Sequence, residues 1–200
     1  MDDSAGTSTG VNLVTGETHY IEIIKNGTTG IINTYSDSAY TVLVNSTSKA
    51  LGTLTSLRYL KCHTSEISTA ANSTLTGYID DVKIYNNITE VNPATLTDYP
   101  LPIVITGDAD LMEKTTETFD DDFTSYADTT AGDLAWATTD TGVIRVNPTT
   151  DVIDWTIQRD GTNDLIYYDL TSVSNSAWTL RFKIHFGTLF ANMNAFAGIT

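Results

Sequence analysis

The chain has 200 residues, of which 40% are hydrophobic and 10% aromatic, so it can fill the core of one large or two small domains and is not expected to be disordered. It carries 25 acidic and 10 basic residues, a formal net charge of -15, and no cluster of Lys or Arg, which argues against nucleic acid as a partner. No apolar run approaches the roughly 20 residues that span a bilayer, so membrane insertion is not expected.

Period-two alternation is frequent along the chain, and apolar residues do not recur at helical spacing, so the sequence predicts an all-β fold. The predicted strands, in chain order, are His19–Ile24, Gly30–Tyr35, Tyr40–Val44, Ser56–Cys62, Gly77–Tyr85, Gly142–Val146, Val152–Ile157, Leu165–Leu170 and Ala177–Phe186. The last is the clearest, because its apolar residues from Trp178 to Phe186 alternate with Thr179, Arg181, Lys183 and His185. One face of that strand is therefore expected to face the core.

The strand pattern lapses between Asn92 and Glu117, where three prolines remove hydrogen-bond donors and Gly107–Asp110 is typical of a turn. We interpret residues 92–117 as a linker between a segment 1–91 and a segment 118–200. The two segments do not repeat one another. The end of the chain, residues 195–200, has the pattern of the interior of a strand.

The ten residues Gly77–Asn86, with the sequence GYIDDVKIYN, resemble the closing strand of laminin G-like and pentraxin-like modules, whose common form is Gly-x-Ile-Asp-Asp-Val-Arg-Ile-Tyr-Asn. Thr18–Gly27 is similar to an earlier strand and turn of the same modules. The order of Trp136, Trp155 and the strand Ala177–Phe186 resembles the N-terminal half of a module. The resemblance implies an antiparallel jelly-roll sandwich of the concanavalin A-like lectin and glucanase superfamily, with its two halves in reversed order.

Two explanations of the reversed order remain open. Either the chain is a fragment of a tandem array, with the C-terminal half of one module followed by the N-terminal half of the next, or the halves pack as one circularly permuted sandwich. In the second case strands between Thr18 and Tyr85 should pair with strands between Gly142 and Phe186, with the linker outside. Burial favours this packing, because a half-sandwich leaves side chains such as Trp178 and Phe182 in water.

The sequence offers no arrangement for catalysis, so we expect a protein that is not an enzyme. Laminarinase-type hydrolases of the same superfamily carry Glu-x-Asp-x-x-Glu, and here Glu17 and Glu22 have a similar spacing but should lie on opposite faces of a strand. No nucleophile elbow, phosphate loop or zinc spacing occurs, and Cys62 is the single cysteine. A degenerate glycoside hydrolase is the third hypothesis for function.

Candidate ligand-binding residues are Arg181, Lys183 and His185, which form an outward polar stripe that suits an acidic glycan or a protein partner, although a solvated sheet face is the commoner reason for such a stripe. The three Trp residues are expected in the core. Candidate metal ligands are the adjacent carboxylates Asp80, Asp81, Asp120, Asp121 and Asp122, which predict at most weak Ca²⁺ binding. For at least one of Asp80 and Asp81 a structural role, accepting backbone N–H groups, is favoured over a metal site, with the other carboxylate solvated.

Four Asn-x-Ser/Thr sequons at Asn26, Asn45, Asn72 and Asn87 fit an extracellular or cell-surface protein, although Met1–Ser4 lacks the basic and apolar regions of a signal peptide. The leading hypothesis is a noncatalytic carbohydrate-binding or adhesion module, with a glycan or a surface protein as its partner. The alternative is a structural spacer repeat of a surface-layer, adhesin or virion protein. Exposed strand edges also predict self-association.

Overall fold

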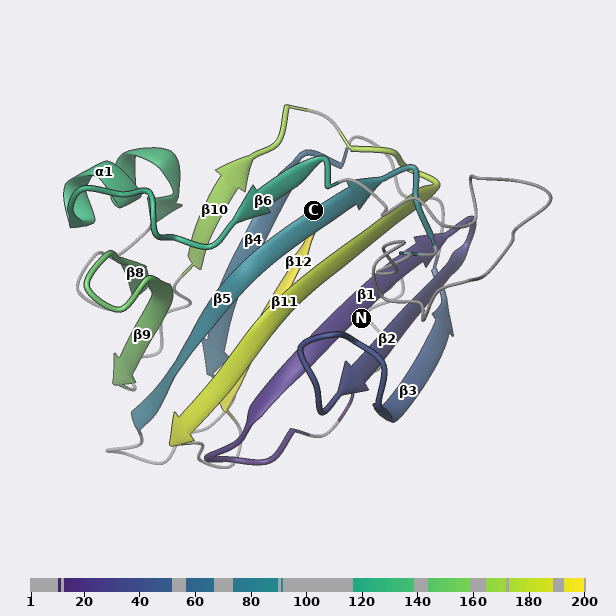
Figure 1. Cartoon of the computed structure of the whole chain (residues 1–200), viewed down its shortest axis with the longest axis horizontal. Coiled ribbons are helices and arrows are strands. Elements are labelled where there is room, and N and C mark those ends of the chain that lie inside the picture. The colour runs from purple at the N-terminus through teal and green to yellow at the C-terminus, as the bar shows by residue number, and fades with distance from the viewer. Residues whose placement is uncertain are drawn as a thin grey trace, which may run out of the picture.

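The segments in which apolar and polar residues alternate form antiparallel strands (Figure 1). The structure is a computed structural model. The structure describes residues 11, 13–51, 57–66, 74–89, 91, 117–138, 144–158, 165–171, 173–188 and 193–199. Its elements are β1 (Thr18–Asn26), β2 (Thr29–Tyr35), β3 (Leu43–Ala50), β4 (Tyr59–Glu66), β5 (Thr74–Asn86), β6 (Phe119–Asp121), α1 (Thr129–Ala135), β7 (Ala137–Thr138), β8 (Ile144–Asn147), β9 (Val152–Gln158), β10 (Leu165–Asp169), β11 (Ala177–Thr188) and β12 (Met193–Ile199).

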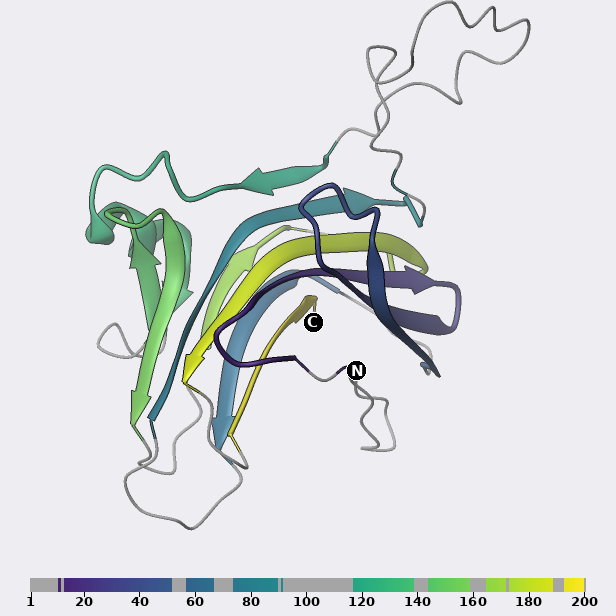
Figure 2. The ribbon, with the colours of Figure 1, turned by 60° about the horizontal axis from the view of Figure 1, so that its bottom comes forward.

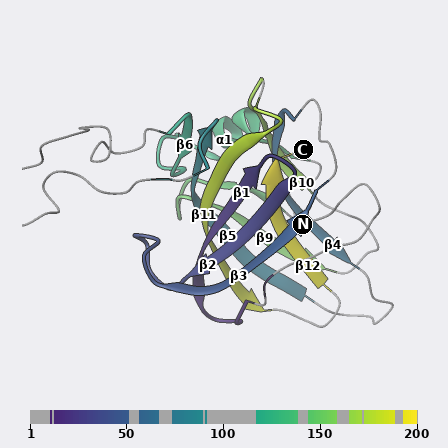
Figure 3. The ribbon, with the colours of Figure 1, turned by 90° about the vertical axis from the view of Figure 1, so that its right-hand side faces the viewer.

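These strands build two antiparallel sheets. The larger sheet has the order β3-β2-β1-β11-β5-β9-β8, with β6 paired to β5 beyond the end of β9, and the smaller has the order β12-β4-β10-β7. Figure 2 shows the larger sheet arching over β4 and β12, and the side view in Figure 3 places these two strands together on one side of β1, β2 and β11. The predicted fold class, an all-β antiparallel sandwich, is confirmed.

Both sheets contain strands from before residue 92 and strands from after residue 117. The central strand β11 pairs with β1 on one side and with β5 on the other, and β5 pairs in turn with β9. In the smaller sheet β4 lies between β10 and β12. The two segments of the chain therefore share both sheets and a common core. Of the proposed linker only Glu117 lies within the described residues.

The apolar positions of β11 face the smaller sheet, as their alternation predicts. Leu180 is fully buried and Phe182 is 3% exposed, and both belong to a single cluster that also contains the three Trp side chains. The cluster draws residues from both sheets, including Leu60 of β4 and Ile166 of β10. The core thus joins the two layers, and it is built from both halves of the chain.

Gly77 of β5 lies where no side chain fits. It pairs with Trp155 of β9 and with Phe186 of β11, and the indole of Trp155 covers its Cα. A Cβ at Gly77 would lie 2.6 Å from Cζ2 of Trp155 and would also meet the backbone oxygen of His185. Both neighbours belong to the packed sheet, so neither can move away without disturbing the core.

We expect Gly77→Ala to destabilise the protein by about 1 to 3 kcal/mol, as overpacking a core does. Urea unfolding would measure the change in the free energy of unfolding. Gly187→Ala is the matched control, because a Cβ there meets the rotatable hydroxyl of Thr76 at 2.8 Å and backbone only at ordinary contact distance. Equal losses of stability in the two variants would contradict the account of Gly77.

The predicted strand Tyr40–Val44 is wrong, because residues 36–42 form a turn and β3 begins only at Leu43. The carboxylate of Asp37 accepts hydrogen bonds from the backbone N–H groups of Thr41 at 3.0 Å and of Val42 at 2.7 Å. These contacts hold the pKa of the Asp37 carboxyl below its usual value. Tyr40, within the turn, has a φ of 58°, which strands do not allow.

Candidate ligand-binding face

The larger sheet carries rows of side chains on the face turned away from the smaller sheet, which we call the outer face. On β11 the residues between the core positions point to this face, and strand pairing lines them up with neighbours on both sides. The rows, read across the sheet, are Thr18, His185, Tyr78, Asp154 and Arg145 (row 1); Tyr35, Tyr20, Lys183 and Asp80 (row 2); Asn33, Glu22, Arg181, Lys83 and Asp120 (row 3); and Ile31, Ile24, Thr179 and Tyr85 (row 4).

Row 3 is centred on a buried ion pair between Arg181 and Glu22. The guanidinium donates through Nε at 2.9 Å and through a terminal nitrogen at 2.6 Å, both to Oε1 of Glu22. The other carboxylate oxygen accepts from Asn33 at 2.9 Å and from the Tyr35 hydroxyl at 3.0 Å. Burial and the neighbouring Glu22 carboxylate raise the pKa of Tyr35 to about 12, so its hydroxyl stays a donor. Every oxygen of Glu22 is thus engaged.

Tyr40 covers this ion pair from the turn between β2 and β3. Its ring lies 4.3 Å from the guanidinium carbon of Arg181 and packs edge-on against Tyr35 and Tyr20. Arg181 therefore points outward as the sequence predicts, but only 7% of it is exposed. Burial also raises the pKa of the Tyr40 hydroxyl. Arg181, a member of the proposed binding stripe, therefore packs under Tyr40 and does not present its charge to solvent.

A β-bulge in β5 sets the positions of the two Asp residues of the resemblance motif. Between two register steps of β11, from Arg181 to Lys183, β5 advances by three residues, from Lys83 to Asp80. Asp81 is the extra residue, with a φ of 54°, and its backbone N–H donates to the carboxylate of Asp80 at 2.7 Å. Asp80 thus accepts a backbone N–H group, and its side chain is turned to the outer face.

The partly exposed lysines of the outer face are each paired with carboxylates. Lys183 contacts Asp80, and Lys83 contacts Asp81 at 2.6 Å and Asp120 at 3.8 Å. Burial opposes the charge of both lysines, yet the hydrogen bonds and attraction to these carboxylates raise the pKa of each lysine above its ordinary value. Both lysines therefore carry their positive charge at neutral pH, and the carboxylates that they contact balance this charge.

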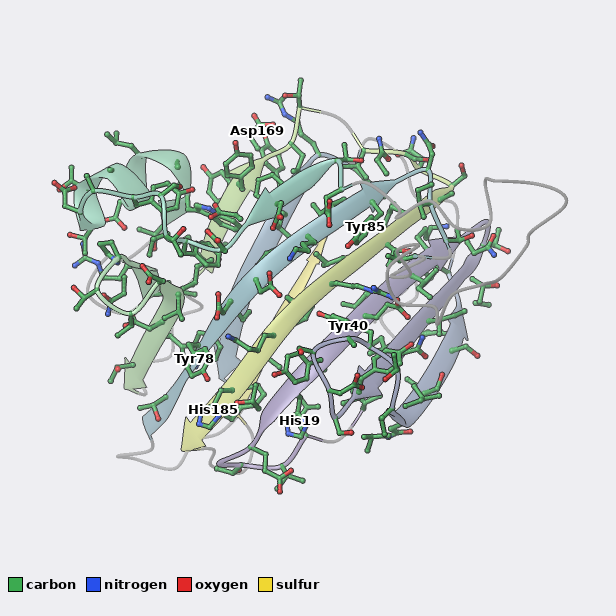
Figure 4. All side chains as sticks on the ribbon, in the orientation of Figure 1. His19, Tyr40, Tyr78, Tyr85, Asp169 and His185 are labelled. Atoms are coloured by element: carbon green, nitrogen blue, oxygen red, sulfur yellow. The ribbon has the colours of Figure 1, made fainter. Side chains whose placement is uncertain are left out.

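Row 1 presents a stacked pair of rings. Tyr78 and His185 lie 5.1 Å apart with an angle of 12° between their planes, and Nδ1 of His185 is 3.4 Å from the Thr18 hydroxyl. Figure 4 shows this pair near one end of β5 and β11, with Tyr40 and Tyr85 farther along the same face. Tyr20 and Tyr35 of row 2 are also partly exposed. Aromatic rings thus alternate with paired polar groups across the outer face.

A hollow of about 490 Å³ adjoins rows 1 and 2 where these strands meet the start of β3. Its lining includes Thr18 and Tyr35 of the rows together with Val14, Val44 and the buried Thr34. The Thr34 hydroxyl is buried without a hydrogen-bond partner among the described residues. His19 also lines the hollow, so residues of both faces of β1 and β2 contribute to it.

The three consecutive carboxylates Asp120, Asp121 and Asp122 do not converge. Asp120 points to the outer face, and burial raises the pKa of its carboxyl. Asp121 turns inward, where it accepts hydrogen bonds from the indole of Trp136, the hydroxyl of Tyr126 and the backbone N–H of Phe123. Asp122 is exposed and accepts from Thr124 at 2.8 Å. Within the described residues, no three His, Cys, Asp or Glu side chains gather closely enough to hold a metal ion.

Three of the four sequons lie in the described part of the chain, and Asn72 lies outside it. Asn26, Asn45 and Asn87 are all exposed. Asn26 and Asn87 flank the start of β11, since Asn26 pairs with Ala177 and the N–H of Asn87 donates to the Ala177 oxygen. Both therefore lie at the same end of the sandwich, away from Tyr78 and His185.

The tyrosines of rows 1 and 2 were not among the site residues proposed from the sequence. Tyr20 has the parity of Glu22 in β1, so strand alternation alone could have placed it on the outer face. Tyr40 could not be found in this way, because it reaches the face from a turn. The run Ser36–Ser38, made of residues that favour turns, was a local signal for this turn.

Comparison of the sequence with protein-family models and with curated proteins finds no match. In the described ranges, no helix is both long and apolar enough to cross a membrane.

Proposed function

We propose that this chain is a noncatalytic recognition module of the concanavalin A-like type, acting at a cell surface or outside the cell, and that it binds carbohydrate on the outer face of the larger sheet. The observation that carries the proposal is the arrangement of partly exposed rings, Tyr78 with His185 and Tyr20 with Tyr35, on adjacent rows of rigid strands. Sugar rings are held by stacking on aromatic side chains and by hydrogen bonds from planar polar groups, and both kinds of group alternate here.

The same side chains favour binding over hydrolysis. A retaining glycosidase needs two carboxyl groups about 5 Å apart, one of them able to donate a proton. Glu22, the most buried glutamate of the outer face, has both oxygens occupied by Arg181, Asn33 and Tyr35. The face is therefore better suited to holding a chain of sugars than to cleaving it, and turnover of β-glucan by the purified protein would count against this view.

Binding should be measured by affinity electrophoresis in gels that contain mixed-linkage β-glucan, galactan or mannan, with and without Ca²⁺. We expect retardation by at least one neutral polysaccharide and a loss of affinity of about tenfold in Tyr78→Ala, which is about 1.4 kcal/mol. Tyr167→Ala is the matched control, because Tyr167 is partly exposed on the opposite side of the sandwich. An array of glycans that shows no binding under either condition would leave the structural spacer as the better hypothesis.

A further inference from the structure

The charges of the outer face limit the kind of glycan it can take. Four cations lie in its rows, and each contacts at least one carboxylate: Arg181, Lys183, Lys83 and Arg145. Arg181 is also buried beneath Tyr40. Asp154 and Asp120 add further negative charge at the β9 and β6 side of the rows. The chain as a whole has a formal charge of -15.

An anionic polymer approaching this face would meet no unneutralised cation and would be repelled at long range. A neutral polymer meets aromatic rings and ion pairs whose charges are balanced, so electrostatic repulsion does not weaken its binding. A single substitution would release Lys183, because its side chain is 28% exposed and Asp80 is its ion-pair partner among the described residues. Lys83 contacts two carboxylates, and Arg181 is buried.

We propose that Asp80 is a specificity-determining residue, which restricts the outer face to uncharged glycans by neutralising Lys183. This inference rests on the proposed carbohydrate binding and names the class of ligand. It reverses the expectation that Arg181, Lys183 and His185 attract an acidic glycan. Asp80 acts by its charge, while its backbone contact to Asp81 requires only an acceptor oxygen.

The substitution Asp80→Asn tests this role, because the amide oxygen can still accept from the N–H of Asp81 while the charge is lost. Affinity electrophoresis would compare mixed-linkage β-glucan with its carboxymethylated derivative and with polygalacturonate. We expect the parent chain to bind neither anionic polymer, and Asp80→Asn to gain at least about tenfold in affinity for both, an effect that weakens above about 0.15 M salt.

Two controls separate the role of Asp80 from a general change of charge. Asp151→Asn removes the same charge at the turn between β8 and β9, where the φ of 54° suits Asn, and it should gain no affinity for anionic polymers. The double variant Asp80→Asn with Lys183→Gln should lose the gained binding, because the released cation is gone.

A parent chain that binds carboxymethylated β-glucan as tightly as the neutral polymer would overturn the inference. So would an Asp80→Asn variant that gains nothing, and both results leave carbohydrate binding by the parent intact. A parent chain that binds no neutral glycan at all would instead remove the proposed function, and this inference with it.

Discussion

Replacing Asp121 by alanine should destabilise the protein by about 3 kcal/mol or more, although the residue lies in a short strand among three consecutive acids. Its carboxylate is 8% exposed and accepts from the Trp136 indole at 2.8 Å, the Tyr126 hydroxyl at 2.6 Å and the Phe123 N–H at 2.8 Å. Trp136 and Phe123 are fully buried, so their donors would be left without a partner. Each buried unpaired donor costs about 1 to 3 kcal/mol.

Urea unfolding followed by tryptophan fluorescence would measure this loss, and Asp122→Ala provides the neighbouring control. Asp122 is exposed and its carboxylate accepts hydrogen bonds from Thr124, so its removal should cost about 1 kcal/mol or less. Asp121→Asn should fall between the two, because an amide oxygen accepts hydrogen bonds but carries no charge. Losses of similar size at positions 121 and 122 would show that Asp121 does not organise this part of the core.

Phe182→Ala should cost about 3 to 5 kcal/mol, the range for removing a buried aromatic side chain. Phe182 is 3% exposed in the centre of β11, and it lies opposite Ile21 of β1 and beside the bulge of β5. The adjacent variant Lys183→Ala should cost under about 1 kcal/mol, since it removes only a partly exposed ion pair. Chemical denaturation of both variants checks the alternation of β11, and equal, small effects would show that its assignment is wrong.

The inner face of the large sheet could be predicted because alternation is a local property. In β11 every second residue from Trp178 to Phe186 is apolar, and all of them are buried. The pairing of strands across residues 92–117 could also be anticipated from burial, since neither half could cover its own apolar face. These parts of the fold follow from the two-residue period of a strand and from the apolar surface area that must be buried away from water.

The outer face could not be predicted in the same way, because it depends on contacts between distant segments. Alternation places Arg181 outward, but it is buried because Tyr40, from a distant turn, and Tyr85 of β5 cover its guanidinium. The bulge at Asp81 likewise requires the register of β5 against β11, which spacing within β5 does not reveal. The side chains that neutralise the lysines were therefore interpreted from sequence as separate metal or structural candidates.

The helix α1 was missed for a different reason. Its seven residues are too few to show an apolar period, and it contains Gly132, which disfavours helices. One signal was present, because Asp128 is a favourable N-cap residue and its carboxylate accepts from the N–H of Ala131 at 2.9 Å. Gly132 is buried, and a Cβ there would lie 2.5 Å from Cβ of Val146, so close packing explains the glycine.

The position of β11 between β1 and β5 has a consequence for how the chain reaches its folded state. Thr18 and His185, which contact each other across β1 and β11, are 167 positions apart in the sequence. During synthesis β1 and β5 emerge long before the strand that joins them, and until then each presents an unpaired edge. Such long loops must close before the central pairings form, so folding should take milliseconds to seconds, the slow end of the range for single domains.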